Sequence, residues 1–350
     1  MSRILVTGGA GYIGSHTAKV LALAGFEPVV VDDLSTGHSW AVKWGPMVKG
    51  TLADRVLLQE LIGGYRIQAV IHFAAHAYVG ESMGNPRQYF RNNVVNTLNL
   101  LNALVDTGVQ HIVFSSTCAT YGIPKEVPIP ETHLQLPVSP YGESKLFIER
   151  ALHWYSQAYG LKWAALRYFN AAGADPDGEI GEEHDPETHL IPRVIQAALR
   201  ERDSVEIYGT DYPTPDGTAI RDYIHVTDLA KAHVLALSYL QEGGESTAFN
   251  LGSGSRHSVR EVIAAVERVV GHRVRTREAP RRPGDPPVLV ADPAKAVRVL
   301  NWHPRYSSIE TMVETAWRWL STPARDQAGT GGRRGSEAVA GPGSFSTAVF

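Results

Sequence analysis

Short apolar runs alternate with longer amphipathic stretches through the first half of the chain. The apolar runs lie at 4–6, 28–31, 47–49, 69–72, 112–114 and 162–166, and helical spacing of apolar residues marks 12–24, 86–106 and 141–159. Continuous apolar strands separated by helices are typical of a parallel sheet that is covered on both faces. The pattern therefore predicts an α/β fold, a doubly wound parallel sheet of Rossmann type over residues 1–170, with its ligand at the carboxyl ends of the strands.

The second half of the chain differs from the first in composition and in the lengths of its predicted elements. Gly, Pro, Asp and Glu crowd residues 173–186, which predicts a loop. Helical patterns at 190–200 and 259–270 alternate with short strands, so we expect a second, smaller α/β substrate-binding lobe over 171–320. A strand near 248–252 is expected to return to the main sheet. The tail at 322–350 lacks apolar periodicity and is predicted to be disordered.

Composition narrows the class of protein. The net charge of -3 over 350 residues gives no reason to expect nucleic acid or an anionic membrane as a partner. Cys118 is the only cysteine, and no apolar run is long enough to cross a bilayer, which together favour a cytoplasmic protein. His184 and His189 flank an acidic loop without a familiar ligand spacing, so no metal is expected.

Three glycines follow the first predicted strand and open the first predicted helix. Gly8, Gly11 and Gly14 have the spacing G-x-x-G-x-x-G, which gives a tight turn and lets a pyrophosphate approach the helix N-terminus. Alone, this motif is also typical of a turn that binds nothing. Asp32 and Asp33 end the next strand, where a carboxylate accepts from ribose hydroxyls and repels a 2′-phosphate. The combination predicts NAD as the cofactor.

Residues able to transfer a proton follow at a later strand end and in the next helix. Thr117 ends the strand, and Tyr141 and Lys145 are spaced i, i+4, so both project from one face of the helix. A tyrosine normally titrates near pH ~10, and a nearby ammonium together with a positive nicotinamide favours the phenolate. The Tyr-x-x-x-Lys spacing alone also suits a surface helix pair. After a dinucleotide motif, it predicts a catalytic site with Tyr141 as the base.

Over residues 3–320 the chain resembles the extended short-chain dehydrogenase/reductase family and, within it, the UDP-glucose 4-epimerases. Besides the motifs above, the resemblance rests on the segments Phe73-Ala74-Ala75, 79–82, 92–94, 166–170, 209–218, 221–226 and 281–285. It implies a resident NAD and a reaction that inverts C4 of a UDP-hexose through a transient 4-keto sugar. Helices near 93–106 and 141–159 resemble those that pair in this family, which implies a homodimer.

The resemblance also implies roles for residues at matching positions. Cofactor contacts are implied for the glycine turn and residues around it: Gly8, Gly11, Tyr12, Ile13, Gly14, Asp32, Asp33, Phe73, Ala74, Ala75, Asn92, Tyr141, Lys145 and Phe169. Contacts with the sugar nucleotide are implied for Thr117, Tyr141, Asn170, His189, Leu190, Tyr208, Arg221, Arg282, Asp285 and Leu289. The two arginines suit a diphosphate clamp, because guanidinium groups bind phosphate oxygens in pairs.

Four positions depart from the family pattern. Thr117 replaces a serine and keeps its hydroxyl, while Thr51 replaces an aspartate that holds adenine, so that contact is in doubt. Ala77 stands where some members have a lysine, and Leu289 stands where some have a tyrosine gate. A smaller gate leaves room beside C2 of the sugar, which implies that N-acetylated hexosamines are also accepted.

Three other functions fit parts of the same pattern. A 4-epimerase of a UDP-pentose or UDP-uronate would share these motifs. A nucleotide-sugar 4,6-dehydratase needs an acid and a base after the threonine, where this chain has Cys118 and Ala119. A non-catalytic Rossmann protein that senses cofactor redox state would not require Tyr141 and Lys145.

Overall fold

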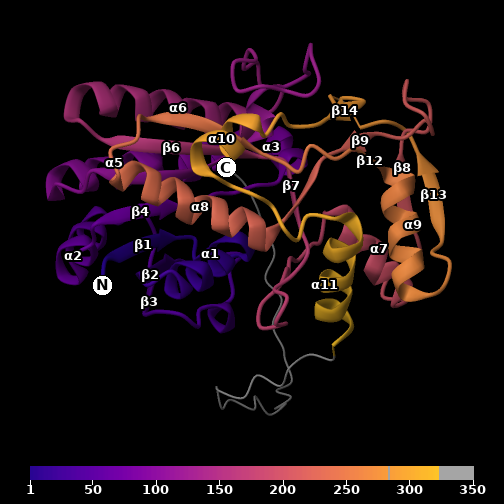
Figure 1. Ribbon diagram of the computed structural model, residues 1–350, viewed down its shortest axis with the longest axis horizontal. Helices are drawn as coiled ribbons and strands as arrows, with labels where there is room; N and C mark the ends of the chain where they lie inside the picture. Colours follow the sequence, from indigo (N-terminus) through magenta and orange to yellow (C-terminus); the bar gives the residue numbers. More distant parts are fainter. Residues whose placement is uncertain (283, 323–350) are drawn as a thin grey trace, which may run out of the picture.

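Seven parallel strands form the central sheet of the computed structural model, which describes residues 1–282 and 284–322 (Figure 1). The sheet has the order β11-β6-β5-β4-β1-β2-β3, so the winding direction reverses between β1 and β4. The strands are β1 (Arg3–Thr7), β2 (Glu27–Asp32), β3 (Met47–Lys49), β4 (Ala69–His72), β5 (His111–Thr117), β6 (Lys162–Tyr168) and β11 (Thr247–Leu251). The predicted doubly wound sheet is confirmed, and the strand expected near 248–252 lies at its edge as β11. The tail predicted to be disordered lies, from residue 323 on, outside the described residues.

Helices cover both faces of this sheet, and each face has its own apolar core (Figure 1). One face carries α1 (Tyr12–Leu23), α8 (Val226–Gln241) and α10 (Ala294–Leu300). The other carries α2 (Arg55–Tyr65), α5 (Asn96–Thr107) and α6 (Pro140–Tyr159). Shorter helical elements are η1 (Ser39–Ala41), α3 (Val79–Gly84), α4 (Pro86–Tyr89), the π-helical turn η2 (Phe90–Val95) and η3 (Cys118–Thr120). The protein is therefore a three-layer α/β structure over this part.

The start of α6 is fixed by its own sequence. The Ser139 side chain caps the helix by accepting from the backbone N–H of Gly142 at 3.2 Å, and Pro140 follows in the first turn. A proline is tolerated at this position because its missing N–H would have no helical partner. Gly160 ends the helix in the left-handed conformation. These signals place Tyr141 in the first turn, beside the carboxyl end of β5.

A second lobe packs around a separate apolar core beyond the sheet (Figure 1). It contains α7 (Leu190–Ala198), α9 (Val259–Val270), α11 (Ile309–Ser321), β8 (Val205–Tyr208) and β13 (Thr276–Ala279). Short strand pairings connect it to the main domain: β7 (Asn170–Ala172) with β10 (Tyr223–His225), and β9 (Ile220–Arg221) with β12 (His257–Ser258) and β14 (Val288–Leu289). The lobe expected over 171–320 interleaves with the main domain, because α8, β11 and α10 from that range pack on the central sheet.

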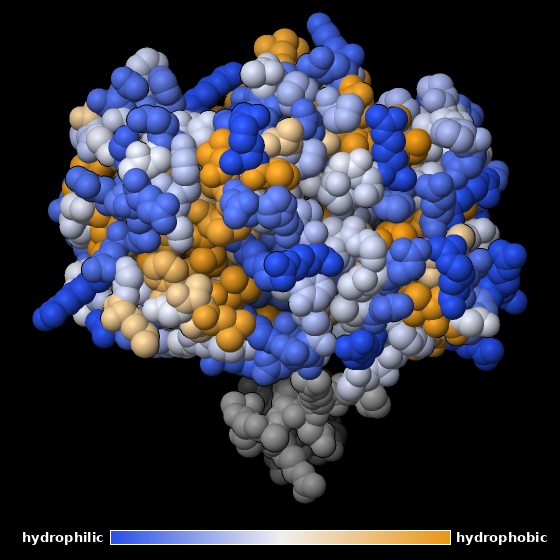
Figure 2. Space-filling model, viewed as in Figure 1, coloured by the Kyte–Doolittle hydropathy of each residue, from blue (hydrophilic) through white to orange (hydrophobic). Residues whose placement is uncertain are grey.

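The surface mixes polar and apolar side chains. On the face seen in Figure 2, hydrophilic residues and smaller apolar patches are interspersed over the main domain and the second lobe. Among the described residues, no helix is both long and apolar enough to span a bilayer.

Candidate active site

The glycine turn lies where the sheet reverses its winding. Gly8 has a φ of +70°, and a Cβ there would come within 2.6 Å of the Ala74 backbone nitrogen after β4. A Cβ on Gly14 would lie 2.2 Å from the Gly8 carbonyl oxygen. Gly11 precedes α1, which has neither a side-chain cap nor an acidic residue in its first turn. The open helix N-terminus, which includes Tyr12 and Ile13, fits the pyrophosphate of a dinucleotide.

The two acids after β2 differ in their surroundings. Asp32 is buried and accepts from the backbone N–H groups of Ala10 at 3.0 Å and Leu34 at 2.9 Å. Burial raises the pKa of its carboxyl above the usual value, against the lowering effect of these hydrogen bonds. Asp33 is exposed and accepts from the Ser35 N–H at 2.9 Å. Asp32 thus braces the glycine turn, and it is the better placed of the two for a cofactor ribose.

Tyr141, Lys145 and Thr117 converge at the carboxyl end of β5. The Lys145 Nζ lies 5.9 Å from the centroid of the Tyr141 ring and donates to the Ser115 carbonyl at 2.8 Å. Burial lowers the pKa of Lys145 to about 7. Burial raises the pKa of Tyr141 well above its ordinary value, although a hydrogen bond with Thr117 lowers it.

The expectation that Lys145, together with a positively charged nicotinamide, favours the Tyr141 phenolate stays a prediction. Both side chains are buried, so the ammonium is itself destabilised. Burial favours the protonated form of the phenol. The site fits a cofactor that brings positive charge and ribose hydroxyls, because Lys145 has one carbonyl acceptor for its three donors.

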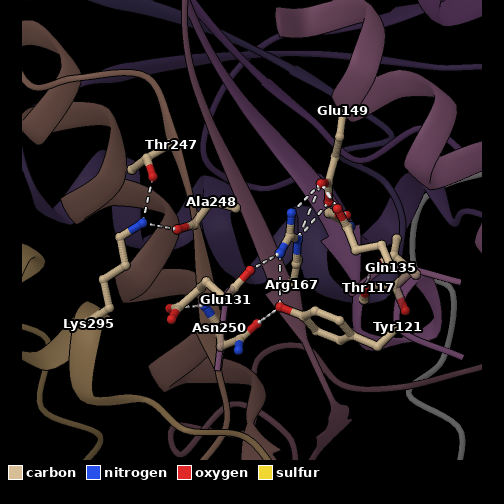
Figure 3. Close-up of polar contacts among 12 residues, drawn as sticks. Thr117, Tyr121, Glu131, Gln135, Glu149, Arg167, Thr247, Ala248, Asn250 and Lys295 are labelled. Atoms are coloured by element: carbon tan, nitrogen blue, oxygen red, sulfur yellow. Dashed lines mark hydrogen bonds and ion pairs between the residues drawn. The ribbon is translucent and has the colours of Figure 1, made fainter. Parts of the chain in front are cut away.

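A buried polar network connects the carboxyl end of β5 to the neighbouring elements (Figure 3). Arg167 on β6 binds Glu149 on α6 through its Nε and Nη2 atoms, with the shortest distance 2.6 Å. Glu149 also accepts from the Ser116 hydroxyl at 2.5 Å, next to Thr117. Arg167 donates to the Tyr121 hydroxyl at 2.9 Å, which in turn donates to the Asn250 side chain at 2.7 Å. The network joins β5, β6, α6 and β11 and was not anticipated from the sequence.

The predicted diphosphate residues lie together in the second lobe. The Arg221 Nη2 is 2.7 Å from Asp285 Oδ1, and the Arg282 Nη2 is 2.9 Å from Asp285 Oδ2. The Arg282 guanidinium carbon also lies 5.1 Å from the centroid of the Tyr208 ring. One carboxylate therefore sits between two guanidinium groups, in the manner of an anionic ligand.

The remaining predicted contact residues occupy three places. Phe169 and Leu289 share a small apolar cluster with Cys118, next to Thr117, and Leu289 pairs in register with Arg221. Asn170 donates to the Asp222 carbonyl at 2.8 Å. Around the glycine turn, the Tyr12 hydroxyl donates to the Gly173 carbonyl at 2.6 Å, and Ala74 and Ala75 follow β4. The Phe73 ring is tilted by 46° to the His233 ring, with 4.6 Å between their centroids. Asn92 lies in η2, where its side chain contacts Asn93 and Asn96.

The loop before α7 contains an ionic cluster that was missed in the sequence. His189, which precedes Leu190 at the start of α7, lies 2.6 Å from Glu182 and 3.2 Å from Glu187. His184 lies 3.1 Å from Glu182. Burial lowers the pKa of each histidine, but the carboxylates outweigh it and raise the pKa of His184 to about 9 and that of His189 to about 10. The repeated Glu-x-His spacing could have indicated this cluster.

Comparison with known proteins places these features in a family. Residues 4–252 match the model of the NAD dependent epimerase/dehydratase family. The UDP-glucose 4-epimerase of Halalkalibacterium halodurans is 52% identical over 90% of this chain and 95% of its own length. The crystal structure of UDP-glucose 4-epimerase from Brucella ovis in complex with NAD is 54% identical, with a TM-score of 0.89 over 91% of this chain and 98% of that one.

A further solved structure resembles the protein at lower identity. The UDP-glucose-4-epimerase from Stenotrophomonas maltophila, with bound NAD and formylated UDP-arabinopyranose, is 41% identical, with a TM-score of 0.88 over 91% of this chain and 98% of that one. The family model covers most of the central sheet, and the glycine turn, Tyr141 and Lys145 lie within it. The chain belongs to the NAD-dependent epimerase/dehydratase family.

Proposed function

We propose that the protein is an NAD-dependent isomerase that interconverts UDP-glucose and UDP-galactose by inverting C4, and that it also accepts UDP-GlcNAc and UDP-GalNAc. The observation that carries the proposal is the convergence of Tyr141, Thr117 and Lys145 at the carboxyl end of β5. The similarity to proteins named UDP-glucose 4-epimerase, at about half identity over nine-tenths of the chain, supports the substrate class.

Three side chains divide the chemical work. Tyr141 takes the proton of the C4 hydroxyl and returns it, and Thr117 holds that hydroxyl by a hydrogen bond. Lys145 binds the cofactor ribose and keeps the phenol oriented. The glycine turn and Lys145 would hold NAD, which would supply reversible hydride transfer at C4 of the sugar.

The residue after Thr117 argues against a dehydratase. Burial raises the pKa of Cys118 to about 12, so its thiol stays protonated and is a poor base. Ala119 follows it and has no acid or base function. Elimination of water from a sugar needs both functions beside the reacting carbon, which favours epimerisation.

Inversion requires a firm hold on the nucleotide and a loose hold on the sugar. Arg221 and Arg282 supply the hold on the diphosphate when Asp285 releases them. Binding energy from this remote part of the substrate then keeps the sugar in the cleft while it turns about its link to the phosphate.

A product assay tests the function. The purified, NAD-loaded protein is incubated with UDP-galactose, UDP-GalNAc or UDP-arabinose, and the products are separated by chromatography. We expect UDP-glucose and UDP-GlcNAc as the main products from the first two. Predominant turnover of the pentose would overturn the choice of substrate and leave the mechanism intact.

A larger side chain at residue 289 should narrow the range of sugars. Leu289 is partly buried beside Phe169 and Cys118, so Leu289→Tyr adds volume to this cluster. We expect kcat/KM for UDP-GalNAc to fall about tenfold more than kcat/KM for UDP-galactose. Leu289→Met conserves volume and is the control, for which both values should stay near those of the parent. Equal losses for both sugars in Leu289→Tyr would exclude a gating role.

We also propose that the protein is a cytoplasmic homodimer. Large apolar side chains are exposed on η2 and α6, among them Trp154 at 68% and Phe147 at 49% exposure, with Phe90 and Val95 on the neighbouring turn. Exposed apolar patches of this kind favour association. Cys118 is the single cysteine of the sequence and leaves no intrachain disulfide, which supports a reducing compartment.

A further inference from the structure

Four side chains with metal-binding atoms meet in the loop before α7, outside the proton-transfer site. Glu182, His184, Glu187 and His189 each offer one ligand atom, and these atoms all lie within 4.8 Å of one another. The two carboxylate side chains are only 4% exposed, whereas the side chains of His184 and His189 are 19% and 45% exposed. Two imidazoles and two carboxylates form a nitrogen and oxygen donor set that suits zinc.

The spacing of the donors matches a tetrahedral site. Zinc binds imidazole nitrogen and carboxylate oxygen at about 2.0–2.2 Å, so the ligand atoms of a tetrahedron lie roughly 3.4 Å apart. His184 Nδ1 is 3.1 Å from Glu182 Oε1 and 3.7 Å from Glu187 Oε2, and His189 Nδ1 is 3.2 Å from Glu187 Oε1. The distance from His189 Nδ1 to Glu182 Oε1 is 2.6 Å, and it would have to lengthen by less than an ångström.

Two of these atoms are buried without a hydrogen-bond partner. Glu182 Oε1 lies 3.1 Å from His184 Nδ1 and 2.6 Å from His189 Nδ1, so these atoms have ion-pair partners, but neither Glu182 Oε1 nor His184 Nδ1 makes a well-aligned hydrogen bond within the described residues. Buried polar atoms in native proteins are nearly always satisfied, so this pair requires an explanation. A cation between the two atoms satisfies both.

A second cluster of acidic side chains in the same loop is neutralised by a lysine. Asp175, Asp177 and Glu179 surround the Lys19 ammonium at 2.8, 2.9 and 2.6 Å, so a side chain of the protein already supplies the cation there. Within residues 1–282 and 284–322, no lysine or arginine pairs with Glu182 or Glu187; their ion-pair partners are His184 and His189, whose neutral rings can bind a metal instead.

We propose that Glu182, His184, Glu187 and His189 bind one divalent cation of the zinc class. The cation joins the loop to the first turn of α7. The cluster also lies near the start of α1, because the His184 ring is 6.3 Å from that of Tyr12 and 6.1 Å from that of Tyr78 between centroids. The role of the cation is to fix the loop that carries His189 and Leu190, beside the nucleotide-sugar site.

Metal binding to the full chain tests this proposal. The NAD-loaded protein is stripped with a chelator, dialysed, and titrated with Zn²⁺ or Mg²⁺ by calorimetry. We expect one Zn²⁺ per chain with saturable binding, and no saturable binding of Mg²⁺. His184→Gln and Glu187→Gln should each lower the affinity for Zn²⁺ by about tenfold or more. His272→Gln is the matched control, since His272 is exposed and lies outside the cluster.

Two results would overturn the proposal: no stoichiometric uptake of Zn²⁺ by the parent, or unchanged affinity in His184→Gln. Circular dichroism checks that each variant is folded. If the variants do not fold, the visible absorption of the parent protein loaded with Co²⁺ tests the site. A tetrahedral site gives strong absorption and supports the proposal, whereas weak absorption of an octahedral ion contradicts it. The metal measurements are independent of epimerase activity, so they stand even if the proposed function fails.

Discussion

Replacing Tyr141 with phenylalanine is expected to lower kcat by about 10²- to 10⁴-fold, because the variant has no group that can take the C4 proton. The ring stays in place in the first turn of α6, where its edge meets Tyr89 at 6.4 Å between centroids. We therefore expect the cofactor to stay bound and the fold to be retained. The measurement is kcat for UDP-galactose, with bound NAD determined on the same samples.

A second tyrosine on the same helix supplies the control. Tyr155 donates its hydroxyl to Asn102 at 2.6 Å, away from the cleft. Tyr155→Phe removes the same atom from α6 and should keep kcat near that of the parent. More than a few per cent of the parent's activity in Tyr141→Phe, with bound NAD, would refute the role of this residue as the base.

Replacing Arg167 with methionine should lower the free energy of unfolding by about 3–5 kcal/mol. The Arg167 and Glu149 side chains are 8% and 6% exposed, so the change leaves a carboxylate buried without its cation. Ser116 and Gln135 still donate to Glu149, but neither carries charge. The measurement is urea unfolding of the NAD-free protein.

Two further variants test whether the buried, unpaired charge is what lowers the free energy of unfolding. Arg3 pairs with Glu27 at 2.8 Å, but both side chains are 42% exposed, so Arg3→Met should leave the free energy of unfolding nearly unchanged. Replacing both Arg167 and Glu149 with methionine should recover part of the lost stability, because no buried charge remains. Equal effects of Arg167→Met and Arg3→Met would show that burial does not set the cost.

Much of the fold could be predicted because buried parallel strands are continuous apolar runs. The ranges expected for β3 and for α9 coincide with those observed. Apolar periodicity could not reveal the π-helical turn inside the helix expected at 86–106. That turn places the buried Asn93 side chain against the His76 carbonyl and the Ser144 hydroxyl, both at 3.0 Å, and these contacts depend on tertiary structure.

The candidate site likewise has parts that local sequence predicts and parts that depend on tertiary contacts. The glycine turn and the Tyr141–Lys145 pair follow from local spacing, which a sequence displays directly. The pairing of Arg167 with Glu149 joins a strand to a helix, and no local pattern marks it. The effect of burial on the pKa of Tyr141 could not be predicted from local spacing, because it depends on how deeply the phenol and the amine of Lys145 are buried.

The edge position of β11 limits how this protein can be recombined with its relatives. β11 pairs with β6, and α8 covers one face of the same sheet, although both come from the second half of the chain. A fragment ending after residue 170 would leave β6 with unpaired backbone groups and an uncovered apolar face, which is a route to aggregation. Chimeric enzymes that exchange sugar specificity should therefore keep α8 and β11 with their native nucleotide-binding half, and graft only the surrounding loops.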